Sequence, residues 1–133
     1  MIKNIYNLGD AALYCDFGDT VNKETNLKVI NYFNDIREKN ITGIKNIAPS
    51  YNKLIIYFDL ELTNYKKIKD TVENLDISTF EPAKTKMVKI PVCFDDEFAL
   101  DLERVEKKVG LGKKEIVNQL ISQKYFCYMT GFI

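Results

Sequence analysis

The sequence predicts an α+β fold, in which residues 1–84 form a four-stranded antiparallel sheet covered on one face by two helices. Two observations support this fold class. Short segments near residues 11–17 and 54–59 alternate between apolar and polar residues, as half-buried strands do. Two longer segments instead carry apolar residues at helical spacing. The chain has 133 residues, of which 46% are hydrophobic, and this is enough for a core without disulfides.

The first strand and helix are predicted within residues 11–38. Residues 11–17 place every second side chain on one face, and Gly18 ends this segment. Asn22 is then suited to cap a helix over residues 22–38. The apolar stripe of this helix is predicted to comprise Leu27, Val29, Ile30, Phe33 and Ile36.

The next elements complete the predicted domain. Residues 44–47 and 54–58 are two β-prone segments joined by a turn, which indicates a hairpin. Thr63 can cap a second helix, whose apolar residues span positions 65–75. A β-prone segment at residues 77–80 follows. The order strand, helix, strand, strand, helix, strand is that of a ferredoxin-like sandwich.

Residues 85–133 differ in character and are predicted to begin a second domain. Residues 87–93 are predicted as a strand, and a helix through residues 102–109 is expected to stop at Gly110. Another short helix is predicted at residues 115–121. The apolar, aromatic residues 125–133 are predicted to form a strand. This strand either pairs with the first domain or another chain, or belongs to a longer protein.

Composition excludes several classes of function. Nineteen basic residues balance nineteen acidic ones, so binding to nucleic acid or to an anionic membrane is disfavoured. Histidine is absent, which excludes Ser-His-Asp triads and histidine-bearing metal sites within this chain. Cys15, Cys93 and Cys127 are predicted to be buried thiols in a reducing compartment. No segment has the length of a signal peptide or a membrane span, so the protein is predicted to be cytoplasmic.

Two groups of residues are chemical candidates, each with a simpler alternative. Asp95, Asp96 and Glu97 could transfer protons or hold magnesium, but they also suit a solvated turn that caps the next helix. Cys93 could be a nucleophile, although the sequence supplies no imidazole base for it and a buried thiol is the simpler interpretation.

Phosphate-binding and interface signals are weaker. The segment at residues 110–112 lacks the glycines and lysine of a phosphate loop, so this chain is expected to bind no cofactor or metal itself, and any ATP site is assigned to a partner. Tyr14, Tyr51 and Tyr57 are predicted to expose aromatic surface suited to a protein interface.

Several motifs, in order along the chain, resemble the family of B-type 5-oxoprolinase subunits, also called allophanate hydrolase subunit 1, which includes a sporulation histidine kinase inhibitor. They occur at residues 8–13 (LGDAAL), 16–20 (DFGDT), 43–51 (GIKNIAPSY), 54–59 (LIIYFD), 90–94 (IPVCF), 97–98, 101–102, 128–129 and 131–132. Together they run from residue 8 nearly to the last residue.

This resemblance implies a fold and a set of partners. A ferredoxin-like domain at residues 1–84 would precede a cyclophilin-like β-barrel, of which residues 85–133 would be the incomplete start. The family's Gly-Phe motif continues into the rest of the barrel, whereas this sequence ends one residue after Phe132. The expected partners are a related barrel subunit, similar to allophanate hydrolase subunit 2, and a lactam-utilisation-type subunit.

The implied activity is ATP-dependent hydrolysis of 5-oxoproline to glutamate, or related urea and allophanate chemistry, by the whole complex. The chain alone is expected to be inactive. Glu97, Tyr128, Gly131 and Phe132 are the candidate site residues, and packing of a terminal aromatic strand is the simpler alternative for the last three. The alternative function is a non-catalytic module that inhibits a sensor histidine kinase by docking on its dimerisation helices.

Overall fold

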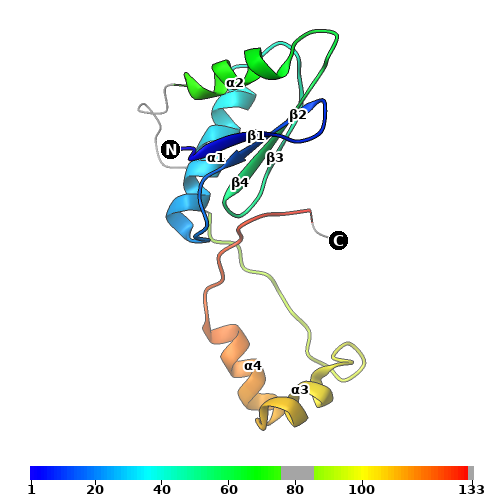
Figure 1. The fold of residues 1–133 in the computed structure, drawn as a ribbon. Helices are drawn as coiled ribbons and strands as arrows, with labels where there is room; N and C mark the ends of the chain where they lie inside the picture. The colour runs from blue at the N-terminus through cyan, green and yellow to red at the C-terminus, as the bar shows by residue number, and fades with distance from the viewer. Residues whose placement is uncertain (76–85, 132–133) are drawn as a thin grey trace. The chain divides into compact units, whose positions relative to one another are not determined.

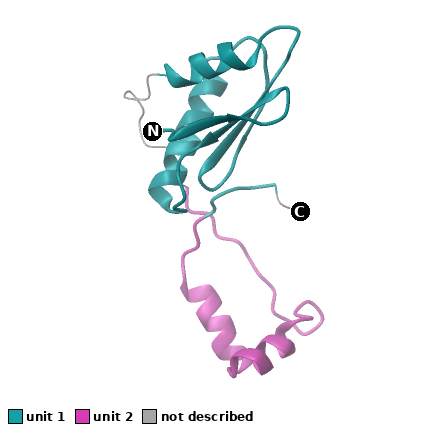
Figure 2. Cartoon of the chain, in the orientation of Figure 1, with its two compact units in different colours: residues 1–84, 127–133 teal, residues 85–126 magenta. Residues whose placement is uncertain are grey.

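The computed structural model describes residues 1–75 and 86–131, and the chain divides into two compact units (Figure 2). The first unit comprises Met1–Lys84 together with Cys127–Ile133, and the second comprises Thr85–Phe126. The sheet and the first two helices belong to the first unit, and the last two helices belong to the second. The proposed division into a ferredoxin-like domain and the start of a barrel stays a prediction.

The first unit is a four-stranded antiparallel sheet with the strand order β1-β2-β4-β3 and two helices (Figure 1). Its elements are β1 (Asn4–Asn7), β2 (Ala12–Asp16), α1 (Lys23–Glu38), β3 (Ile44–Pro49), β4 (Lys53–Phe58) and α2 (Tyr65–Glu73). The predicted α+β class, the predicted helices and the β3–β4 hairpin are therefore confirmed.

Strand β1 was not predicted, and it pairs with the outer edge of β2. Its register places Ile5 opposite Cys15 and Tyr6 opposite Tyr14. The predicted strand at residues 77–80 lies outside the described residues. The described order is thus two strands, a helix, two strands and a helix, and the ferredoxin-like name is not established by it.

One face of the sheet and the two helices enclose the core. Alternate residues of β2 and β4 are buried, as the two-residue period of a strand requires. Helix α1 contributes Val29, Tyr32 and Ile36, so its buried face is rotated from the predicted stripe. The full cluster is Leu13, Cys15, Phe17, Val29, Tyr32, Ile36, Leu54, Ile56, Phe58, Ile68 and Val72.

The helix caps match the sequence prediction at one helix and differ at the other. Asn22 caps α1, because its side-chain oxygen accepts a hydrogen bond from the Thr25 amide at 2.8 Å. The predicted cap of α2, Thr63, is wrong by one residue. Asn64 has the extended backbone of a cap, and its side chain accepts from the Lys67 amide at 3.0 Å.

The second unit contains α3 (Leu102–Val109) and α4 (Lys113–Ser122), which confirms both predicted helices. Gly110 ends α3 in the left-handed conformation, with φ of 71°, as predicted. The predicted strands at residues 87–93 and 125–133 are wrong wherever they are described, because residues 86–93 and 125–131 have no regular structure. A strand needs a neighbouring strand for its backbone groups, and no described strand pairs with either segment.

The cysteines also differ from expectation. Cys15 is buried, but Cys93 and Cys127 are exposed, because both lie in segments that do not join the sheet. No helix within residues 1–75 and 86–131 has the length and hydropathy needed to span a bilayer.

Candidate functional site

The segment that contains Tyr128 docks against the sheet unit through one buried side chain, Asn26 of α1. The Asn26 amide nitrogen donates to the backbone carbonyls of Tyr51 and Tyr128, each at 2.9 Å, and of Ser50 at 3.1 Å. Asn26 is only 1% exposed. One side chain thus joins helix α1, the β3–β4 turn and a segment near residue 130.

Local structure brings these carbonyls to Asn26. Asn26 lies one helical turn before Val29, on the buried face of α1. The Ser50 amide donates to the Lys53 carbonyl at 2.9 Å, which closes the β3–β4 turn. A buried amide is tolerated only when its hydrogen bonds are satisfied, and the three carbonyls satisfy it here.

Further contacts hold the same segment. The rings of Tyr51 and Tyr128 are 6.0 Å apart and tilted by 41°, within the range of favourable aromatic pairs. The Ser50 hydroxyl lies 3.6 Å from the Met129 sulfur, a weak contact. Gly131 has φ of 93°, a conformation that side chains rarely adopt, so the chain can turn there.

A charged pair lies directly beside the turn. Lys53 donates to the carboxylate of Asp16 and, at 2.9 Å, to the Gly18 carbonyl. The hydrogen bond from Lys53, and then that from the Gly18 amide, lowers the pKa of Asp16. The same pair raises the pKa of Lys53. The pair and the amide of Asn52, which donates to the Gly18 carbonyl, fix the loop after β2 against the turn.

The predicted acidic cluster forms a turn and no shared site. Phe98 and Ala99 donate their amides to the Asp95 carbonyl, and Asp96 forms an ion pair with Lys113 of α4. That ion pair lowers the pKa of Asp96. The turn does not cap α3, whose first flanking residue is Asp101. Within the described residues, no group of three or more acidic or cysteine side chains could hold a metal ion.

The four candidate site residues are distributed over the chain. Glu97 belongs to the second unit, whereas Tyr128 and Gly131 belong to the first, and Phe132 lies outside the described residues. The described geometry therefore groups only Tyr128 and Gly131. Their surroundings offer backbone anchoring and aromatic packing, which position the segment.

Asn26, Ser50 and Met129 were not among the predicted site residues. One signal existed for Asn26: it is a polar residue three positions before Val29, in line with the buried face of a helix. A polar side chain at such a position needs a specific partner. The partner, the Tyr128 carbonyl, is distant in sequence and could not be identified from spacing.

Comparison with known proteins identifies the family. A family model described as carboxyltransferase domain, subdomain C and D, matches residues 3–133. The chain belongs to this family. The B-type 5-oxoprolinase subunit of Bacillus subtilis (strain 168) is 28% identical to it over 96% of this chain and 58% of that protein. These matches confirm the resemblance to the B-type 5-oxoprolinase subunits, and the chain spans little more than half of this relative's length.

Two crystal structures are similar to this family member. The protein TTHA0988 is 23% identical and superposes with a TM-score of 0.67, over 82% of this chain and 21% of that one. An uncharacterized protein, PH0987 of Pyrococcus horikoshii, is 26% identical with a TM-score of 0.52, over 86% of this chain and 53% of that one. The first likeness supports the fold alone.

Proposed function

We propose that this chain acts as the amino-terminal part of a protein similar to the B-type 5-oxoprolinase subunits. In this role it works with a related barrel subunit and a lactam-utilisation-type subunit in ATP-dependent hydrolysis of 5-oxoproline to glutamate, or in related urea and allophanate chemistry. The observation that supports this most is the family match over residues 3–133, together with the Bacillus subtilis relative. ATP is bound by the complex in this proposal, and the chain alone is inactive.

The second unit supports assembly with another polypeptide. Its first residues extend without regular structure and expose large apolar side chains, up to 86% in the case of Leu100. The exposed residues in this stretch are Met87, Val88, Ile90, Val92, Phe98 and Leu100. Exposed apolar surface of this kind is typical of regions that are buried on association.

In this proposal the Asn26 contacts give the Tyr128 segment a fixed starting position against the sheet unit. Tyr128, Gly131 and Phe132, with Glu97, remain the candidate residues for the shared cleft. Their role would be to shape a small-molecule site that the partner subunits complete. This agrees with the absence of histidine, because the chain cannot supply an imidazole base.

Reconstitution tests the proposal directly. The chain is mixed with the two partner subunits, and glutamate release from 5-oxoproline is followed with and without ATP. We expect release that requires ATP, the partners and this chain, and none from the chain alone. If the same preparation extended to the relative's full length also gives no turnover, the hydrolase proposal fails.

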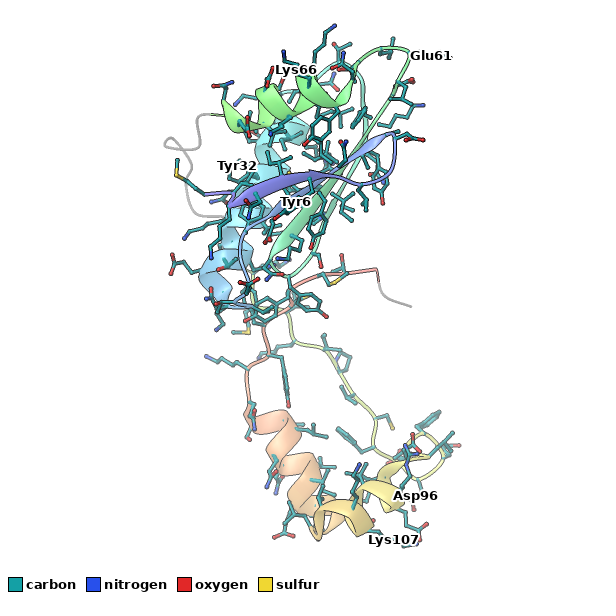
Figure 3. All side chains as sticks on the ribbon, viewed as in Figure 1. Tyr6, Tyr32, Glu61, Lys66, Asp96 and Lys107 are labelled. Atoms are coloured by element: carbon teal, nitrogen blue, oxygen red, sulfur yellow. The ribbon has the colours of Figure 1, made fainter. Side chains whose placement is uncertain are left out.

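A second candidate is a module that inhibits a sensor histidine kinase, and the open face of the sheet favours it. Tyr6 and Tyr57 are 50% and 40% exposed there, and Tyr6 pairs with Tyr14 at a ring distance of 6.3 Å. Figure 3 shows Tyr6 on β1. Autophosphorylation of a candidate kinase, measured with a saturating amount of this chain, tests the role. A rate that stays unchanged contradicts it.

A further inference from the structure

The free edge of the sheet at β3 is the starting point for an inference that is independent of the proposed function. Strand β3 is last in the order β1-β2-β4-β3, so it is hydrogen-bonded to β4 on one side only. The backbone groups on its other side are open to an added strand. Many proteins bind extended peptides at such an edge.

The ladder identifies which residue of β3 offers its backbone. In an antiparallel pair, residues alternate between those that bond to the partner and those whose N–H and C=O face away. Ser50 donates its amide to Lys53 across the hairpin. Ala48, two positions earlier, therefore belongs to the bonded set, which leaves Ile47 and Pro49 facing outward. Proline has no N–H, so Ile47 is the residue that presents both a donor and an acceptor.

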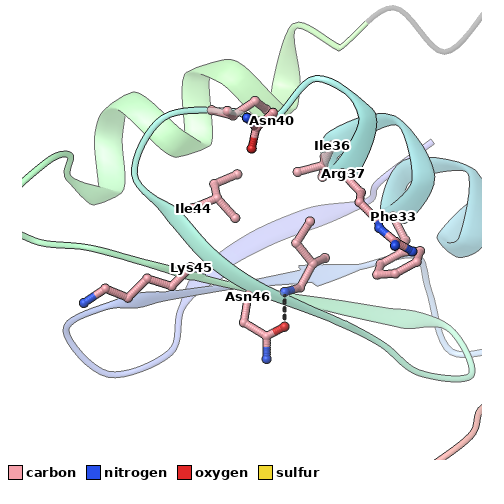
Figure 4. Close-up of a pocket in the computed structure, with 9 residues that line it drawn as sticks. Phe33, Ile36, Arg37, Asn40, Ile44, Lys45 and Asn46 are labelled. Atoms are coloured by element: carbon pink, nitrogen blue, oxygen red, sulfur yellow. Dashed lines mark hydrogen bonds between the residues drawn. The ribbon is translucent and has the colours of Figure 1, made fainter.

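The outward amide of Ile47 is occupied by a local stand-in. It donates to the side-chain oxygen of Asn46 at 2.8 Å, the bond drawn in Figure 4. Asn46 is exposed, so little packing holds its side chain in this position. A carbonyl of an incoming chain could replace the Asn46 oxygen and satisfy the same donor.

A cavity of about 350 Å³ lies beside this edge, between β3 and the last turns of α1 (Figure 4). Its apolar lining comes from both elements and from the loop between them, and Arg37 lies next to Phe33 at one end. No described carboxylate pairs with Arg37, whereas Lys45 already pairs with Asp59 at 3.0 Å. The cavity therefore combines apolar contact with one uncompensated positive charge.

Two features limit the length of an added strand. The pairing of β3 with β4 is irregular between Ile44 and Asn46, and such a bulge interrupts the regular spacing of outward groups. Pro49 removes the next outward amide. The edge thus suits a short segment with one pair of backbone hydrogen bonds, which disfavours pairing between the β3 strands of two copies.

We propose that the β3 edge and the adjoining α1 cavity form a binding site for a short, extended, acidic peptide. The peptide backbone pairs with Ile47. One apolar side chain enters the cavity, and a carboxylate two residues away, on the same face of the peptide, meets Arg37.

The test uses a defined probe, the peptide acetyl-Thr-Val-Thr-Glu-Thr-amide, and a matched peptide with Lys in place of Glu. Each is titrated into the isotope-labelled 133-residue chain while backbone amide resonances are recorded. We expect saturable shifts centred on Ile47 and its β3 neighbours. The Glu peptide is expected to bind about threefold more tightly than the Lys peptide, as one exposed charge pair allows.

Variants separate the two parts of the site. Arg37→Glu should reverse the preference between the peptides, whereas the control Lys66→Glu, an exposed residue of α2, should leave it unchanged. Asn46→Ala should tighten binding about twofold, because it removes the oxygen that competes for the Ile47 amide. Shifts located elsewhere than β3, equal binding of both peptides, or an Arg37→Glu variant that is folded but keeps the original preference would each overturn the proposal.

Discussion

The side-chain amide of Asn26 donates a hydrogen bond to the backbone carbonyl of Tyr128 at 2.9 Å, although 102 positions separate them in the sequence. The same amide serves two carbonyls of the β3–β4 turn. Because this is one buried group with three acceptors from two distant segments, its loss should affect both segments together.

Asn26→Asp should destabilise the first unit by about 3 kcal/mol, because the new carboxylate would face three carbonyl oxygens without a donor. Urea unfolding measures the loss, and hydrogen exchange should show faster exchange at residues 127–131. The control is Asn74→Asp, since the amide of Asn74 donates to the Asp70 carbonyl on the surface. Equal losses in the two variants would show that Asn26 is not an anchor.

Asp16 should contribute to stability in a pH-dependent way. Lys53 and the Gly18 amide lower its pKa, so the contribution is present above its ordinary pKa of 3.8 and disappears as the pH falls below it. Asp16→Asn should cost about 1 kcal/mol at pH 7 and much less at pH 2. Urea unfolding at the two pH values, with the exposed Asp10→Asn as control, measures this. A cost that is independent of pH would contradict the assignment.

Cys15 should be the slow thiol of the three. Burial raises the pKa of the Cys15 thiol from 9.0 to about 12, whereas Cys93 and Cys127 are exposed. We expect two thiols per chain to react rapidly with a disulfide reagent at pH 8, and the third only in denaturant. A third rapid thiol would show that this part of the core is open.

The same shift gives a prediction at high pH. The folded state keeps the Cys15 proton, whereas the unfolded chain loses it above about pH 9, so stability should fall between pH 9 and 12. Cys15→Ala lowers stability at every pH through its cavity, but it should remove this part of the fall. Denaturant unfolding across that range compares the two proteins, and parallel pH curves would argue against the buried thiol as the cause.

Gly110→Ala should weaken the second unit by about 1 kcal/mol, because φ of 71° is strained for a residue with a Cβ atom. Gly112→Ala is the matched control. Its φ is −75°, and an added Cβ would meet only the Glu115 side chain at 3.7 Å. Circular dichroism of the helical signal during heating compares them. Similar losses from both glycines would place the effect elsewhere than the cap.

The regular elements that pack on the core could be predicted from the sequence. Helix α2 and strands β2 and β4 carry clear periods, because one side of each is buried by the rest of the unit. Strand β1 was missed because just one of its four residues, Ile5, is half-buried and the other three are exposed. An edge strand depends on pairing with its neighbour, and short polar segments carry no periodic signal for that.

The opposite error arose in the apolar segments at residues 87–93 and 125–131. Their composition favours strands, but β-propensity measures how well a residue fits an existing sheet. Neither segment has such a neighbour among the described strands. The candidate site was predictable in part: Tyr128 and Gly131 were found through family resemblance, whereas Asn26 required knowledge of a contact between distant segments.

The interrupted edge of β3 also bears on how the protein avoids self-propagating aggregation. Fibril growth requires an uninterrupted ladder of amides onto which one chain after another can add. Pro49 and the irregularity near Asn46 break this ladder on both sides of Ile47. The sheet can therefore accept a single short guest while giving it no continuous template from which amyloid could spread.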